Sequence, residues 1–150
     1  MSDDRLYQFR ALAGIALALL FAQFLLGMWL NLFASFPTIP FQSGFGGMMS
    51  SMMAGGMSIL MVHMMLGYAL LVVSILVFAF AMASEGQTPI LLSALGLASV
   101  IVAGLGGLGF MFSGFQNDSF SYLMAVGFIS AFANYIVLSL AGPGRMRVES

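Results

Sequence analysis

The sequence predicts an all-α integral membrane protein, a bundle of four transmembrane helices with both termini on the cytoplasmic side. Hydrophobic residues make up 61% of the 150 residues and charged residues only 6%, whereas a soluble domain usually carries about 25% charged residues. Four apolar segments are each long enough to cross the roughly 30 Å hydrocarbon core of a bilayer. We therefore expect one membrane domain, located in the cell (cytoplasmic) membrane and surrounded by lipid.

Short polar segments rich in proline and glycine separate the apolar segments. Pro37 follows the first, Gly86 lies between the second and third, Asn117 lies between the third and fourth, and Gly142-Pro143-Gly144 follows the fourth. Such residues commonly end helices or form the turns between them. The predicted spans are residues 11–36, 57–83, 89–112 and 120–141.

The arginines predict the orientation. Arg5 and Arg10 precede the first span, and Arg145 and Arg147 follow the last. Positively charged residues favour the cytoplasmic side of membrane proteins, so both termini are expected there and the loop of residues 37–56 on the outer side. This loop carries no charge. We expect it to fold onto the outer end of the bundle, to lie in the membrane interface, or to contact a partner chain.

The residues best suited to metal or haem chemistry are concentrated in one segment. Eight methionines and the only histidine, His63, fall between Met48 and Met65, and the chain contains no cysteine. Thioether and imidazole groups are therefore the main candidate ligands. On a helical wheel His63 shares a face with Gly56 and Gly67, and this face is distinct from a methionine stripe. The stripe comprises Met57, Met61 and Met64, followed by Tyr68.

One hypothesis is that His63 binds the iron of a b-type haem in a membrane electron-transfer complex, since an ionisable residue within a span is a candidate functional residue. The small residues Gly56 and Gly67 would allow a porphyrin to approach the backbone. A methionine would complete the axial ligation, or a second copy of the chain would supply its own imidazole. The candidate methionines are Met28, Met111 and Met124.

The same histidine also fits a packing role. Polar side chains often form hydrogen bonds between membrane helices. A neutral His63 imidazole could bond in this way to Gln23, to Asn31 or to a backbone carbonyl of a neighbouring helix. We expect Gln23 near the middle of the membrane and Asn31 close to the level of His63.

A second hypothesis is Cu(I) binding. Soft thioether ligands select Cu(I), and Met57 and Met61 lie four residues apart on one helix face, with Met64 and His63 as further candidate ligands. This spacing resembles the MxxxM motif of copper transporters of the Ctr type, and the resemblance, which is limited to that motif, implies copper handling.

A third hypothesis is a non-catalytic subunit that packs against larger membrane partners or forms a homo-oligomer. Small residues on one face of a membrane helix allow close packing, and the third span has such a face. Neither a Ser/His/Asp catalytic group nor a charged transport site within a span is evident, so the chain is not expected to be an enzyme by itself. A net charge of −1 without lysine argues against nucleic acid as a partner. The predicted face comprises Ser93, Gly96, Ala103, Gly104 and Gly107.

Overall fold

The computed structural model describes residues 3–34, 58–83 and 86–145, and the regular structure of these residues is entirely α-helical. The helices are α1 (Asp3–Phe33), α3 (Ser58–Met82), α4 (Gln87–Phe112) and α5 (Asp118–Arg145). Each provides a candidate membrane span of 23 to 27 residues, within which an 18-residue window has a mean hydropathy between 1.9 and 2.5. About 20 helical residues are enough to cross a bilayer, so the prediction of four helices able to span a membrane is confirmed.

Two helix ends extend at least four residues beyond the predicted spans. α1 begins at Asp3 rather than at residue 11, and its early turns contact α5, where the Arg10 Nη2 atom donates to the Leu140 carbonyl oxygen at 3.3 Å. α5 continues to Arg145 through the Gly142-Pro143-Gly144 sequence that was expected to end it. Proline removes one backbone hydrogen bond and its ring crowds the carbonyl one turn earlier, yet the helix continues for two residues beyond Pro143.

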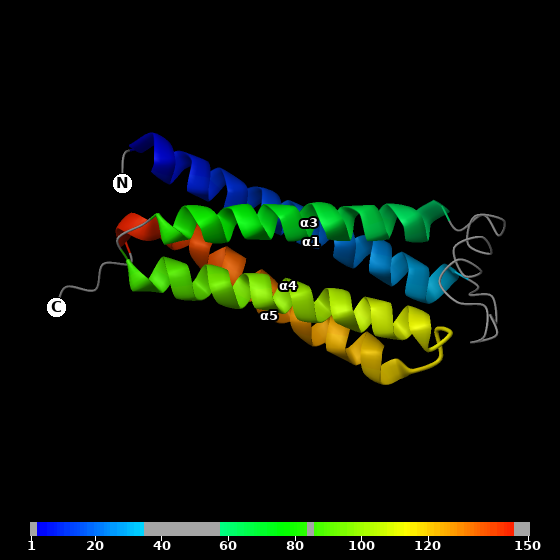
Figure 1. Ribbon diagram of the computed structural model, residues 1–150. Helices are drawn as coiled ribbons and strands as arrows, with labels where there is room; N and C mark the ends of the chain where they lie inside the picture. The colour runs from blue at the N-terminus through cyan, green and yellow to red at the C-terminus, as the bar shows by residue number, and fades with distance from the viewer. Residues whose placement is uncertain (1–2, 35–57, 84–85, 146–150) are drawn as a thin grey trace.

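The four helices form an antiparallel bundle (Figure 1). α1 packs against α3 and α5, and α4 also packs against α3 and α5. α1 begins and α5 ends at the same end of the bundle, while the turn between α4 and α5 lies at the opposite end. The placement of the first end on the cytoplasmic side stays a prediction from the arginine distribution.

Small residues make up much of the bundle interior. In α1 the buried side chains recur every three or four residues, which is the spacing of one helix face, and they include Ala13 and Ala16. Large apolar side chains cover the outside of all four helices instead, as expected for surfaces that contact lipid. The main buried cluster comprises Phe9, Ala13, Ala16, Leu20, Leu70, Val77, Ala81, Val100, Ala131, Tyr135 and Leu138.

The turn after α4 closes that helix with a left-handed backbone. Gly114 and Phe115 have φ angles of 69° and 62°, and the Phe115 N–H donates to the Phe110 carbonyl at 3.0 Å. A left-handed conformation costs a residue other than glycine about 1–2 kcal/mol. Packing of the Phe115 ring against buried Met111 and edge-on against Phe110 offsets this cost.

α4 and α5 approach each other closely at Gly127. A β-carbon added at Gly127 would lie 2.8 Å from both the Ser99 carbonyl oxygen and the Ala103 nitrogen. The hydroxyl oxygens of Ser99 and Ser130 are 2.9 Å apart across the same interface. A glycine at this position is what allows the two backbones to approach.

Candidate functional site

His63 lies where α3 packs against α1. Its imidazole faces Gly27, where an added β-carbon would be 3.5 Å from the His63 Cε1 atom. The Gln23 Nε2 atom donates to the His63 carbonyl oxygen at 2.9 Å. Gln23 therefore forms the expected type of interhelical hydrogen bond, although the acceptor is the backbone of His63 and not its imidazole.

The face of α3 below His63 is occupied by α1. A β-carbon at Gly67 would lie 2.8 Å from the Gln23 Nε2 atom, so the glutamine amide fills the space beside this glycine. That is the space in which the haem hypothesis places a porphyrin. Gly56, the other small residue of that hypothesis, lies outside the described residues.

Two buried polar atoms at this contact have no hydrogen-bond partner in the described part of the chain, namely His63 Nδ1 and Gln23 Oε1. A buried polar atom without a partner costs about 1–3 kcal/mol. The imidazole Nδ1 can offer either a lone pair or an N–H group, depending on its tautomer. Buried polar atoms in proteins usually have a hydrogen-bond partner. The unpaired Nδ1 atom therefore leaves His63 able to bind a group outside the described residues.

The three candidate axial methionines occupy three different places. Met111 is buried between α3 and α4, in a small cluster that also contains Met64. Met124 packs over Gly106 and Gly107 of α4, with its sulfur 3.3 Å from the β-carbon position of Gly107. Met28 is exposed on α1, the helix that His63 faces, and follows Gly27 in sequence.

The proposed copper ligands are only partly described. Met57 lies outside the described residues, Met61 is half-buried on α3, and Met64 packs with Met111. Within the residues that the structure describes, no group of three or more His, Cys, Asp or Glu side chains could hold a metal ion. Cu(I) binding by the Met57–Met61 pair stays a prediction.

Asn31 is not the residue of α1 that lies opposite His63. Gly27 and Gln23 lie opposite His63 and Gly67, whereas Asn31 is exposed near the end of α1. Counting residues from the ends of two neighbouring helices aligns their side chains only when those ends lie at the same depth in the membrane. The shift between α1 and α3 along the bundle axis brings Gln23, and not Asn31, to His63.

Sequence reasoning also missed the exposure of Tyr68. Its side chain is 59% exposed on the outward face of α3, which we define as Met65, Tyr68, Val72 and Ile75. Tyr68 lies about 15 Å along the helix axis from Ser58, near the middle of the roughly 30 Å hydrocarbon core. None of the hydrogen bonds formed by the described residues involves its hydroxyl.

Comparison of the chain with protein-family models, with characterised proteins and with solved structures found no match.

Proposed function

We propose that this chain is a small integral-membrane subunit of a larger membrane complex, and that it binds its partner through the outward face of α3. The observation that carries the proposal is the exposed side chain of Tyr68, which lies near the middle of the predicted span and whose hydroxyl forms no hydrogen bond among the described residues. Tyrosines at membrane boundaries reach water with their hydroxyl groups, but one near the bilayer centre cannot.

Lipid tails offer this hydroxyl no acceptor. Moving a hydroxyl from water into a purely apolar medium costs about 4–8 kcal/mol when no hydrogen bond replaces those to water. A partner helix can supply a carbonyl or a polar side chain as acceptor. Met65, which is 71% exposed beside Tyr68, adds a flexible thioether side chain of the kind that adapts to contact surfaces.

Replacing Tyr68 with phenylalanine is expected to weaken the complex while preserving the shape of the face. Hydrogen bonds between membrane helices contribute about 0.6–2 kcal/mol, so the dissociation constant should rise about three- to thirtyfold. The measurement is the fraction of chain that migrates as the complex on native gels of gently solubilised membranes. The matched control is Tyr122→Phe, because Tyr122 is exposed in the first turns of α5, where water can satisfy its hydroxyl.

A photo-crosslinking side chain tests the same face directly. Placed at Met65, it should form an adduct with a protein partner in native membranes. Placed at Ile129, which is 65% exposed on α5, it should form adducts with lipid. Lipid adducts at both positions, together with an unchanged complex in Tyr68→Phe, would contradict the proposal.

We also propose a second function, in which this subunit carries a b-type haem for electron transfer with His63 as an axial ligand. The supporting observation is the buried Nδ1 atom of His63 that has no partner among the described residues. Because Gln23 fills the space beside Gly67, the haem would have to approach the imidazole from another side. Met28, on the helix that His63 faces, or a group from a partner chain would supply the second ligand.

A dithionite-reduced minus air-oxidised absorption spectrum of the solubilised complex tests this second function. We expect a shifted Soret band with α and β bands, and their complete loss in His63→Ala. The control is Gln23→Ala, which removes the α1–α3 hydrogen bond but keeps the imidazole and should therefore keep the bands. A flat spectrum from folded wild-type protein that retains its partners would rule out haem.

A further inference from the structure

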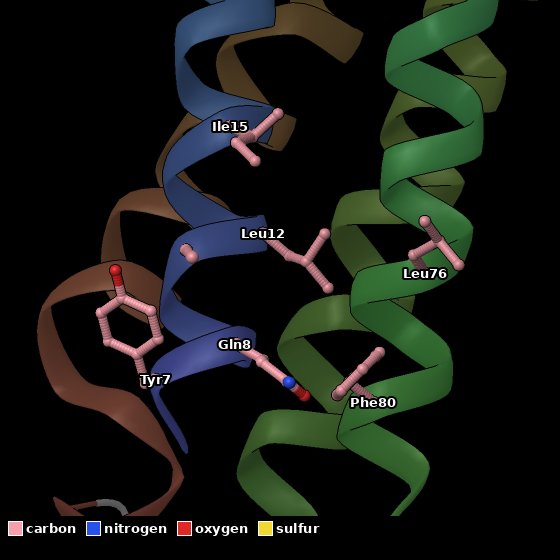
Figure 2. A pocket seen from close by; sticks show the side chains of 7 residues that line it. Tyr7, Gln8, Leu12, Ile15, Leu76 and Phe80 are labelled. Atoms are coloured by element: carbon pink, nitrogen blue, oxygen red, sulfur yellow. The ribbon is translucent and has the colours of Figure 1, made fainter. Parts of the chain in front are cut away.

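An open groove of about 380 Å³ runs between α1 and α3 near the beginning of α1. In Figure 2, Gln8 extends from α1 towards Phe80 of α3, and Leu12 extends towards the same helix. Tyr7 also lines the groove. Gln8 lies at one end of the groove, and the wall continues from there as apolar side chains. The apolar wall comprises Ala11, Leu12, Ile15, Leu76 and Phe80.

We propose that this groove binds one membrane phospholipid, with part of an acyl chain along the apolar wall and the Gln8 amide donating to an oxygen of the glycerol linkage. This inference does not depend on the proposed function, because the groove and the outward face of α3 use different side chains.

The depth of the groove supports a phospholipid. The predicted first span begins at Ala11, and Gln8 lies three residues, about 4.5 Å along the helix axis, before it. Gln8 therefore falls in the membrane interface, where the glycerol linkages of lipids are found. From Gln8 to Ile15 the apolar wall extends about 10 Å towards the bilayer centre. The groove therefore has its polar and apolar parts in the same order along the membrane normal as a phospholipid.

The size and chemistry of the groove agree with this occupant. Sites for small molecules usually measure about 300–1,000 Å³, and 380 Å³ accommodates a section of one chain rather than a whole lipid. The Gln8 side chain carries two N–H donors, which match acceptor oxygens at that depth. A tail held between two helices would also contact more protein atoms than a lipid on a convex surface.

Native mass spectrometry of the detergent-solubilised protein, delipidated and then titrated with dioleoyl-phosphatidylglycerol, tests the proposal. We expect one lipid per chain to remain bound to the wild type at low detergent concentration. Ala11→Leu should abolish this binding by filling the groove. Ala18→Leu is the matched control, because Ala18 is exposed on the same helix but does not line the groove. Gln8→Leu should retain less lipid than the wild type.

Three results would overturn the proposal: equal lipid retention by Ala11→Leu and Ala18→Leu, a molecule with the mass of a quinone bound to the protein before delipidation, or a second copy of the chain in place of lipid. Circular dichroism checks that each variant keeps its helices. Should Ala11→Leu fail to fold, equal retention by wild type and Gln8→Leu overturns the proposal on its own. Tyr68→Phe should bind lipid normally, which separates this outcome from that of the proposed partner surface.

Discussion

Replacing Gly127 with alanine is expected to force α4 and α5 apart and to lower the free energy of unfolding severely. The new β-carbon would lie 2.8 Å from the Ser99 carbonyl oxygen and from the Ala103 nitrogen. Both are backbone atoms of α4, so no side-chain rotation can relieve the overlap. Overpacking of an interior typically costs about 1–3 kcal/mol and occasionally more. The measurement is reversible unfolding in mixed detergent micelles, monitored by circular dichroism.

The control for Gly127 is the same substitution at Gly104 of α4, where nothing lies within 4 Å of an added β-carbon. Gly104→Ala should be neutral, or should stabilise the helix by about 0.5–1 kcal/mol because alanine loses less backbone entropy than glycine. Equal unfolding midpoints for the two variants would mean that α4 and α5 do not approach each other at Gly127.

The sequence was sufficient to predict the number and approximate extent of the helices. The bilayer sets the required length of an apolar segment, and residues such as Pro37 and Gly86 mark the breaks. The start of α1 at Asp3 was not predicted, because the polar residues before Ala11 form helix without adding to the apolar segment. Contacts such as that of Arg10 with α5 involve a different part of the chain.

The small-residue face of α4 was predicted only in part. Gly96 is buried and Ala103 contacts the Gly127 position, as expected for a packed face. Gly104 was assigned to the same face but is exposed, whereas the unassigned Gly106 is buried against Met124. Both glycines lie at the edges of the face, on opposite sides. Helical periodicity defines the centre of a face, but the neighbouring helix decides which edge is covered.

The candidate site was predicted as a set of chemical groups and not as an arrangement. The sequence identified His63, Gln23 and Gly67 as interior residues, and the structure brings these three together. It could not place Met64 against Met111, or Tyr68 on the outside. Met64 and Tyr68 are only about 40° apart on the helical wheel. The boundary between bundle and exterior passes between them, and that boundary depends on where α4 lies.

Gly96 and Tyr135 are expected to show strong energetic coupling, because the tyrosine ring occupies the space that a side chain at position 96 would need. A β-carbon at Gly96 would lie 2.9 to 3.2 Å from three atoms of Tyr135. Tyr135 is completely buried, and its hydroxyl lies beside the Ser74 side chain of α3. The ring is therefore held by three helices, and Gly96→Ala alone should cost about 1–3 kcal/mol.

A double-mutant cycle measures this coupling. Tyr135→Leu alone leaves a cavity and is also destabilising, but in the double variant the alanine at position 96 enters that cavity. The double variant should therefore lose less stability than the sum of the two single losses, with a coupling energy of about 0.5–3 kcal/mol. Gly104→Ala combined with Tyr135→Leu serves as the control and should give additive losses, since position 104 is open. Additive losses in the Gly96 cycle as well would show that the Tyr135 ring does not pack over Gly96. Such additivity would undermine the packing of α5 against α4 on which the described bundle depends.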